Sequence, residues 1–302
     1  MFHVEFVTII GTYFNMNVSF IDFWSNFDNK NNLLLDVLQN CFHNVNVVEP
    51  KNADVIFYSL FGKEHLLYKD TKKIFYTGEA VHWDTKKIIY PENEKSFASL
   101  SFSYGTGKNN LRFPIWYFYI DWFNKKTYRN PQWLVPEKYL YNINNDFVNT
   151  GTNFCAAIYS NQLKTRKTIV KSISKYKEVD CYGRVENFKK LEGNEKEKVQ
   201  LLLKYKFSLA MENTLLNGYH TEKLIHAKIA GTIPIYYGSN TVINEFNKNA
   251  FIVFDYYKKR KSLNKIIEID NDKTLFNEIK KQPLLLEKIS FDNVYKFFVK
   301  VL

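Results

Sequence analysis

One segment of the sequence gathers side chains that could bind a phosphate and a sugar. Residues 205–239 read YKFSLAMENTLLNGYHTEKLIHAKIAGTIPIYYGS. The apolar start predicts a buried strand that ends at Glu212-Asn213, and Asn217-Gly218 is a turn signal. We expect Thr221 to cap the helix that follows, with the first amides of that helix pointing into the preceding loop.

Two charged residues open this predicted helix, and they allow two interpretations. A helix N-terminus beside a lysine favours an anion, so Lys223 and the backbone amides could hold a diphosphate. Glu222 could accept hydrogen bonds from ribose or sugar hydroxyls. The alternative is an ordinary capped helix that carries a solvated Glu222–Lys223 pair. The residue types alone leave both interpretations open.

The chain around this segment alternates between short apolar runs and amphipathic runs, which is typical of βα units. A first series contains predicted strands at His3–Ile10, Asp54–Leu60, Lys73–Thr77 and Phe97–Ser103, with a helix at Leu33–Cys41. A second series contains strands at Asn153–Tyr159, Glu178–Tyr182, Lys206–Met211, Ile233–Tyr237 and Phe251–Phe254, with helices at Thr165–Tyr176, Glu195–Tyr205 and Thr221–Ala230. Most of the remaining chain to Leu302 is predicted to be helical.

Two βα series predict an α/β protein with two doubly wound, Rossmann-like domains. The length of 302 residues agrees, because single domains typically have about 100–200 residues. We place the domains at 1–150 and 151–302, with the boundary inside Tyr128–Thr150, which holds Pro131 and Pro136. Since such sheets bind ligands at the carboxyl ends of their strands, two facing sheets would form a central cleft.

Composition sets broad limits on the class of protein. The net charge of +11 fits either a lysine-rich soluble surface or an anionic partner, such as a nucleotide, a nucleic acid or a membrane surface. The three cysteines, Cys41, Cys155 and Cys181, lack the spacing of a zinc site, and Cys155 is predicted to be a buried thiol. The first residues do not resemble a signal peptide and no stretch is long enough to span a membrane. These features predict a cytoplasmic or otherwise soluble protein with at most peripheral membrane association.

The segment 205–239 closely resembles the donor-binding motif of the α-1,3/4-fucosyltransferases, glycosyltransferase family 10. The matching residues are Tyr205-Lys206-Phe207, Glu212-Asn213, Tyr219, Thr221-Glu222-Lys223 and Ile233–Ser239. Further similarity lies in IFYTGE at Ile74–Glu79, LRFP at Leu111–Pro114, the segment Asn153–Arg166 and the tail ISFDNVYKFF. Met211 and Ala80 depart from the family pattern, and Tyr90–Gly107 matches it poorly.

The resemblance implies a GT-B fold, with an N-terminal acceptor domain and a C-terminal nucleotide-sugar domain. It also implies inverting α-1,3 transfer of fucose from GDP-fucose to a GlcNAc-containing oligosaccharide. Inversion needs a base on the face of the sugar opposite the leaving group, and Glu79 is the candidate. The implied donor-binding residues are Arg166, Asn213, Tyr219, Thr221, Glu222 and Lys223.

We expect no metal at this site. The one D-x-D match, Asp270-Asn271-Asp272, lies in a lysine-rich region and is interpreted as a helix boundary. Arg166 and Lys223 could neutralise the leaving diphosphate in place of a metal. His220 and His226 have no convincing ligand spacing.

Other roles stay open. His82 and Trp83 could stack on an acceptor sugar or only pack a loop, and Arg184 could approach the nucleotide or form a surface ion pair. One alternative function is a basic nucleotide- or RNA-binding protein, although no RNP, KH or zinc-finger signature is present. Another is a GT-B transferase that uses a different nucleotide sugar. The acceptor position and the oligomeric state are not predicted.

Overall fold

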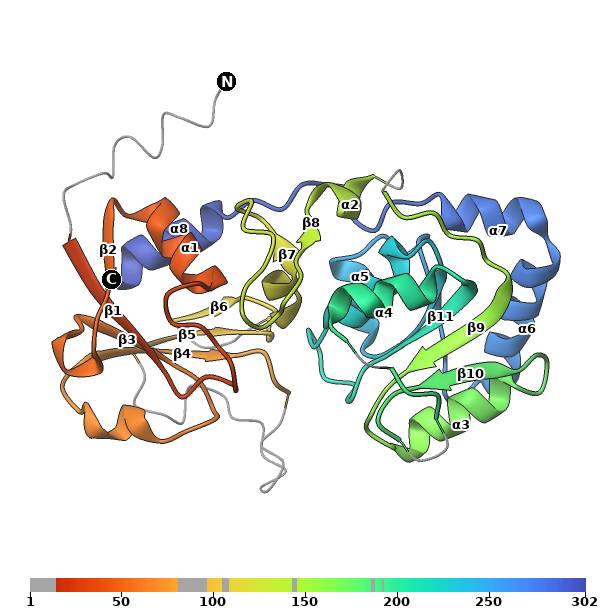
Figure 1. Ribbon diagram of the computed structural model, residues 1–302, viewed down its shortest axis with the longest axis horizontal. Coiled ribbons are helices and arrows are strands. Elements are labelled where there is room, and N and C mark those ends of the chain that lie inside the picture. Colours follow the sequence, from red (N-terminus) through yellow and green to blue (C-terminus); the bar gives the residue numbers. More distant parts are fainter. Residues whose placement is uncertain (1–14, 81–96, 105–108, 143–145, 186–187, 192) are drawn as a thin grey trace. The chain divides into compact units, whose positions relative to one another are not determined.

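The computed structural model describes residues 15–80, 97–104, 109–142, 146–185, 188–191 and 193–302. The chain forms two compact units (Figure 1). The N-terminal unit comprises Met1–Phe118, Thr127–Asn130 and Ile289–Leu302. The C-terminal unit comprises Tyr119–Lys126 and Pro131–Lys288.

A six-stranded parallel sheet, in the order β2-β1-β3-β4-β5-β6, forms the centre of the N-terminal unit. Its strands are β1 (Asn15–Ile21), β2 (Asn44–Val47), β3 (Val55–Tyr58), β4 (Lys72–Thr77), β5 (Ala98–Ser101) and β6 (Asn110–Arg112). All four residues of β3 are buried, as expected for a strand covered on both faces. Short 3-10 helices occur at Pro50–Asn52, Glu64–Leu67 and Ile115–Tyr119.

The last helix of the chain packs on this first unit. Helix α8 (Asp292–Val301) contacts α1 (Leu33–Cys41), and the ring of Phe298 lies edge-on to Phe57, with centroids 6.0 Å apart. The ammonium group of Lys72 donates to the carbonyls of Val301 and Leu302, both at 3.2 Å. Residues 289–302 therefore belong to the N-terminal unit, which differs from the predicted C-terminal domain of 151–302.

The C-terminal unit contains a five-stranded parallel sheet in the order β10-β9-β11-β12-β13. Its strands are β9 (Asn153–Ile158), β10 (Val179–Tyr182), β11 (Tyr205–Met211), β12 (Ile233–Tyr237) and β13 (Ile252–Val253). The unit's helices are α2 (Lys138–Tyr141), α3 (Lys164–Ile173), α4 (Glu195–Leu202), α5 (Glu222–Ile229), α6 (Lys259–Asn271) and α7 (Lys273–Lys280), with a 3-10 helix at Asn240–Asn244. A small pair, β7 (Ile120–Asp121) and β8 (Val135–Pro136), lies outside the sheet.

Helices cover both faces of this sheet (Figure 1). Side chains alternate along β11, so Phe207, Leu209 and Met211 share one core with residues of α3 and α6. Helix α5 packs on β11 and β12, and α4 packs on α5. This arrangement is the predicted doubly wound one, and it places the start of α5 at the carboxyl ends of the strands.

Most predicted elements occur within a few residues of their expected positions, and α1 and β12 coincide with their predicted bounds. The strand expected at His3–Ile10 lies outside the described residues. Strands β1, β2 and β6 were not predicted. The helix predicted at Glu195–Tyr205 ends at Leu202, because the chain then turns directly into β11. In the described part of the chain, no helix is long and apolar enough to cross a membrane.

Candidate functional site

The carboxyl end of β11 and the start of α5 bring most of the predicted site residues together. Strand β11 ends at Met211, and the backbone N–H of Glu212 then donates to the carbonyl of Tyr237 at the end of β12 (2.7 Å). The loop to α5 turns at Gly218, whose φ of +81° suits a residue without a side chain. Its N–H donates to the hydroxyl of Thr241 (2.9 Å), which fixes the loop beside β12.

Glu212 is a buried carboxylate at the centre of this region, with 1% of its surface exposed. Its two oxygens accept hydrogen bonds from the backbone N–H and the hydroxyl of Thr221, both at 2.8 Å. The prediction that Thr221 caps α5 is therefore wrong in its contact, because the hydroxyl donates to Glu212 and accepts no hydrogen bond from a backbone amide of the helix. The sequence interpretation assigned Glu212 no role, although an acidic residue directly after a buried strand could have marked it.

Lys223 is ion-paired. Its ammonium group donates to the hydroxyl of Thr221 at 2.7 Å and lies 3.4 Å from Glu212 and 3.6 Å from Glu222. Burial alone would lower the pKa of Lys223, but Glu222 and Glu212 outweigh it and the pKa is raised. A quarter of the side chain remains exposed, so a ligand can reach a lysine that stays charged. The alternative of a solvated surface pair does not fit these contacts.

Glu222 is surrounded by groups that stabilise its charge. Burial would raise the pKa of this carboxyl, but the positive charge of Lys223, together with His226 and Lys198, lowers it to about 2. Lys198 comes from α4, which packs on α5, and sequence reasoning missed it. His226 lies one turn after Glu222 on α5, which is a spacing that places two side chains on one helix face.

Arg166, in the first turn of α3, joins the same edge of the sheet. The guanidinium donates to the carbonyl of Met211 and to the side-chain oxygen of Asn213, both at 2.6 Å, and to the carbonyl of Asn161 at 3.3 Å. It also lies 5.5 Å from the ring centroid of Tyr159. Only 2% of the residue is exposed, and burial lowers its pKa. Its Nε has no hydrogen-bond partner among the described residues.

The remaining predicted residues of this unit divide into two groups. Tyr219 is buried, and it is one of the groups that raise the pKa of Arg166 against the larger effect of burial. Arg184 is exposed, although its backbone N–H donates to the hydroxyl of Ser160 just beyond β9. The D-x-D segment is a helix boundary as predicted, because α6 ends at Asn271 and Asp272 caps α7. Asp270 pairs there with Lys177 and Lys206.

Three cations and two carboxylates therefore meet at the start of α5. Arg166, Lys198 and Lys223 face Glu212 and Glu222, and His226 is neutral because burial lowers its pKa to about 4. The site keeps a surplus of one positive charge, and the first turn of α5 adds amides with no side-chain cap. Such a site can hold a diphosphate and stabilise charge that grows on it. No group of three or more potential metal-ligating side chains occurs among the residues that the structure describes.

In the N-terminal unit, Glu79 lies just past the carboxyl end of β4. Its backbone N–H donates to the hydroxyl of Thr77 at 3.2 Å, and that hydroxyl donates to the carbonyl of Glu79 at 3.0 Å. Gly78 permits the turn, because a Cβ there would lie 2.6 Å from Ile115 and 2.8 Å from the hydroxyl of Tyr76. The charge of Glu79 also reaches Tyr76, whose pKa is raised well above its usual value by burial first and by Glu79 second.

An aromatic cluster lies at the same edge of this sheet. Trp24 follows β1 and contacts the rings of Tyr76 and Phe61 edge-on, with centroids 6.2 Å and 6.4 Å apart. Phe61 is half exposed and Trp24 is partly exposed. Exposed aromatic faces suit sugar rings, and the sequence reasoning did not single out either residue. His82 and Trp83, which it did single out, lie outside the described residues.

Two families of sequences match successive parts of the chain. The Alpha-(1,3)-fucosyltransferase FucT N-terminal domain family matches residues 18–119, and the Glycosyltransferase family 10 (fucosyltransferase) C-terminal family matches residues 149–280. The second match contains the whole cluster at the start of α5, and the first contains Glu79.

Curated relatives show the same relationship. A putative fucosyltransferase of Acanthamoeba polyphaga mimivirus is 32% identical over 152 residues, which is 47% of this chain and 25% of that protein. The α-(1,3)-fucosyltransferase FucT of Helicobacter pylori is 27% identical over 289 residues, which is 83% of this chain and 57% of that protein. The chain thus spans between a quarter and about half of the length of these relatives.

Solved structures share the fold. A crystal structure of an α1,3-fucosyltransferase has a TM-score of 0.73 and 22% identity, covering 95% of this chain and 90% of that one. A structure of an α1,3-fucosyltransferase with GDP-fucose has a TM-score of 0.70 and 21% identity, with the same coverage. The two doubly wound units of the chain have the GT-B fold of these structures. Within that fold class, the chain belongs to glycosyltransferase family 10, the fucosyltransferases.

Proposed function

We propose that the protein transfers fucose from GDP-fucose to a hydroxyl of a GlcNAc-containing glycan, in α-1,3 linkage, with inversion and without a metal ion. The supporting observation is the charged cluster at the start of α5, in which Arg166 and Lys223 flank a partly exposed, uncapped helix N-terminus. This arrangement fits a nucleoside diphosphate, and a relative of the chain from Helicobacter pylori bears the name α-(1,3)-fucosyltransferase FucT.

The leaving group explains the cations. As the bond between the sugar C1 and the β-phosphate oxygen breaks, negative charge grows on the diphosphate. Lys223 and Arg166 would neutralise that charge, and the amides of α5 would donate to the phosphate oxygens. Asn213 is tied to Arg166, and Tyr219 is among the groups that raise the pKa of Arg166, so both belong to the diphosphate or ribose side of the donor. Two fixed cations make a bound metal unnecessary in this proposal.

Glu222 is the carboxylate proposed to accept hydrogen bonds from ribose or fucose hydroxyls. Its pKa of about 2 keeps it ionised at neutral pH, so it can only accept hydrogen bonds. An ionised carboxylate can also stabilise the positive charge that develops on the sugar ring. Glu212 is more deeply buried and already accepts both hydrogen bonds from Thr221, so its proposed role is to position Thr221 and Lys223.

Glu79 is the proposed base. A base takes the proton from the acceptor hydroxyl as that oxygen attacks C1 from the face opposite the leaving group. Thr77 holds the backbone of Glu79 on both sides of the residue. Trp24 and Phe61 would offer the acceptor sugar an aromatic surface near the same sheet edge.

The acceptor and the donor can be tested in one experiment. Purified protein is incubated with GDP-fucose, GDP-mannose or UDP-galactose and an array of glycans, and the product linkage is determined by NMR. We expect transfer from GDP-fucose alone, onto O3 of GlcNAc, with an α-linked product. Transfer from another nucleotide sugar would support a different GT-B transferase, and a retained configuration at C1 would contradict the role of Glu79.

A binding assay separates the transferase from a basic RNA-binding protein. We expect GDP to raise the melting temperature more than an RNA oligonucleotide does. RNA binding that strengthens with oligonucleotide length and weakens steeply with salt would favour the second function. Arg166→Ala is the matched variant, since it should remove the GDP effect and leave the protein's surface cations unchanged.

A further inference from the structure

A second cation-rich cavity lies in the C-terminal unit, away from the charged cluster at the start of α5. Its volume is about 270 Å³, and its lysines are Lys228, near the end of α5, and Lys280 and Lys281, at the end of α7. No carboxylate is among the described residues that line it. Its other polar lining residues are Tyr139, Asn142, Asn149, Asn277 and Gln282.

This cavity lies at the opposite edge of the sheet from the donor motif. Asn149 lines it and donates to the carbonyls of Tyr205 and Ala230, at 3.0 and 2.8 Å. Tyr205 begins β11 and Ala230 precedes β12, and these two strands run parallel. Their amino ends therefore border the lysine cavity, whereas their carboxyl ends border Glu212 and Thr221.

Lys228 is the most deeply placed of the three lysines, with 6% of its surface exposed. It donates to the carbonyls of Ala250, Ile279 and Lys280 at 3.2, 3.0 and 3.2 Å. Two of these carbonyls belong to the last turn of α7, where a cation is favourable. These contacts explain why Lys228 can be buried, but they do not explain why two more lysines lie beside it.

The neighbouring lysines repel Lys228. Burial first, and then the charge of Lys280, lower the pKa of Lys228 to about 7, and burial lowers the pKa of Lys280 as well. Lys280 uses one donor on the side-chain oxygen of Asn149, at 3.0 Å. Lys281 is exposed, and its ammonium group has no hydrogen bond or ion pair among the described residues. The carboxylate of Asp146 accepts a hydrogen bond from the hydroxyl of Tyr139, which lines the cavity.

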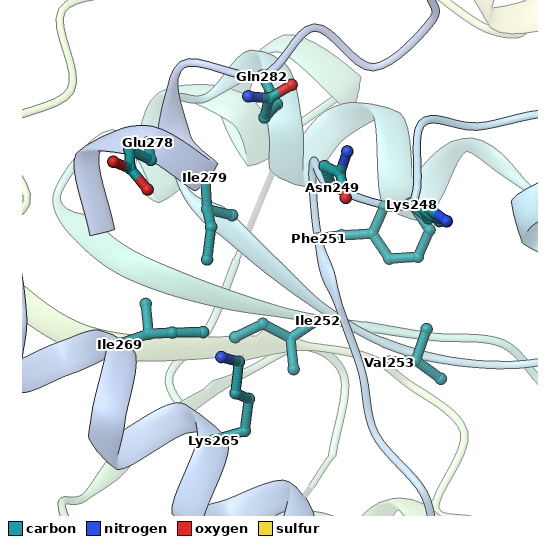
Figure 2. A pocket seen from close by; sticks show the side chains of 10 residues that line it. All are labelled: Lys248, Asn249, Phe251, Ile252, Val253, Lys265, Ile269, Glu278, Ile279 and Gln282. Carbon is teal, nitrogen blue, oxygen red and sulfur yellow. The ribbon is translucent and has the colours of Figure 1, made fainter. Parts of the chain in front are cut away.

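A neighbouring cavity in the same unit shows a different charge pattern. Figure 2 shows Ile252, Ile269 and Ile279 pointing into a cavity of about 470 Å³ that is also bordered by Glu278, Lys248 and Lys265. A carboxylate, that of Glu278, accompanies the lysines there. The described residues that line the lysine cavity include none, although both cavities share Gln282.

We propose that the cavity formed by Lys228, Lys280 and Lys281 binds the phosphate group of a small phosphate monoester. Lys280 and Lys281 contact the phosphate oxygens, and Lys228 contributes its charge from behind. Gln282 accepts a hydrogen bond from Asn247 through its oxygen, at 3.3 Å, which leaves its NH₂ group to donate. A dianionic phosphate fits three lysines better than a single carboxylate does, and the volume admits a group of about the size of a sugar phosphate.

The test is calorimetric titration of the whole chain with inorganic phosphate and with a hexose 6-phosphate, in the presence of saturating GDP. The unphosphorylated hexose is the ligand control. We expect Lys280→Ala/Lys281→Ala to weaken hexose phosphate binding about tenfold or more, because each charged hydrogen bond contributes about 1.5–3 kcal/mol. Lys258→Ala/Lys261→Ala removes the same charge from an exposed part of α6 and its start, and should leave binding unchanged. Omitting GDP should not change the affinity of this site.

Proton uptake provides a second measurement. Because the pKa of Lys228 is about 7, a bound phosphate should protonate it, and the heat of binding should depend on the ionisation enthalpy of the buffer. Lys228→Met should remove this buffer dependence after correction for the phosphate's own ionisation. Absence of binding at millimolar hexose phosphate, or equal losses in the two double variants, would overturn the proposal. Such results would leave the assignment of the donor site untouched, because Arg166→Ala tests that site separately.

Discussion

Lys223 lies between the carboxylates of Glu212 and Glu222 and shares the hydroxyl of Thr221. When a diphosphate binds this ammonium group, Lys223 exchanges one ion pair for another. Binding therefore does not require the desolvation of an unpaired lysine. Glu212 would retain its two hydrogen bonds from Thr221 throughout. The carboxylates thus hold the lysine in place for its proposed role.

Replacement of Lys223 by alanine is expected to lower kcat about 10²–10³-fold, because a fixed group that meets growing charge acts mainly in the transition state. GDP binding should also weaken. Stability should fall by about 1–3 kcal/mol, since the buried Glu212 loses its counter-ion. Steady-state kinetics and denaturant unfolding measure the two effects.

The double variant Glu212→Gln/Lys223→Ala separates those effects. A glutamine at 212 can accept from the N–H of Thr221 and donate to its hydroxyl, with no charge left unpaired. We expect stability to recover while kcat stays low. Recovery of kcat together with stability would mean that Lys223 has only a structural role.

Glu79→Gln is expected to lower kcat about 10²–10⁴-fold, which is the usual contribution of a general base. The backbone of residue 79 is held by Thr77, so the variant should keep the shape of the turn. GDP affinity and melting temperature are the controls, and both should match the wild type. Near-normal turnover would remove Glu79 from the mechanism.

His226 predicts a pH dependence of stability. Its folded-state pKa of about 4 lies below the ordinary value of 6.5, so the unfolded chain binds this proton more readily. The wild type should therefore lose up to about 3 kcal/mol as pH falls from 6.5 towards 4, through this residue alone. His226→Phe should lack that loss, because phenylalanine binds no proton. The substitution breaks no hydrogen bond of the buried Nε2 of His226, which has no partner among the described residues. Parallel stability–pH curves for the two proteins would contradict this account.

At the scale of elements, the turn after β4 depends on close packing. Gly78→Ala would bring a Cβ to 2.6 Å from Ile115 and 2.8 Å from the hydroxyl of Tyr76. We expect a loss of about 1–3 kcal/mol in the free energy of unfolding, as for other overpacked sites, and a fall in kcat as Glu79 moves. Tyr76→Phe removes that hydroxyl, so Gly78→Ala/Tyr76→Phe should recover part of the stability. No recovery would identify Ile115 as the whole obstacle.

The sequence predicted most of the buried parallel strands, though not β1, because a strand covered on both faces is a continuous apolar run, as in β11 and β12. It missed β2, whose NVNV sequence has only partly buried or exposed residues and no such run. It also missed β6, where Asn110–Arg112 is short and half-buried. Pairing with a neighbouring strand defines these elements, and one segment of sequence does not carry that information.

The site was predicted in its residue types and less well in its contacts. The motif and its turn placed Arg166, Asn213, Tyr219 and Lys223 at one sheet edge, as the structure does for the described residues. The partner of Thr221 was wrong, because its hydroxyl donates to the buried Glu212 and accepts from the ammonium group of Lys223 instead of from a helix amide. Lys198 was missed because it comes from another helix, which only tertiary packing brings near Glu222.

At the scale of the whole molecule, the net charge of +11 does not require a nucleic-acid partner. Part of this charge lies on buried or partly buried side chains. Arg166, Lys223 and Lys228 are three of them, and each contacts polar groups within the protein. Family membership is confirmed, and so is the predicted fold class. The GlcNAc acceptor and the inversion at C1 of fucose are proposals.

Full activity in EDTA is expected, since the proposed leaving-group charge is met by Arg166, Lys223 and the amides of α5. The measurement is the initial rate of fucose transfer before and after chelation, with Mn²⁺ and Mg²⁺ added back. A metal-dependent transferase assayed in parallel controls for chelation. Loss of transfer with EDTA and its return with Mn²⁺ would refute the metal-free mechanism.

The place of α8 on the N-terminal unit has a consequence for biosynthesis. The six-stranded sheet is complete by Arg112, but the helix that packs on α1 is made about 180 residues later. At about 5–20 residues per second, a ribosome needs roughly 10–40 s to supply it. During that interval the nascent chain carries an unfinished first unit, and the C-terminal unit receives its last segment at Lys288, shortly before α8 is made. The first unit is thus expected to reach its native state only when synthesis of the chain is nearly complete.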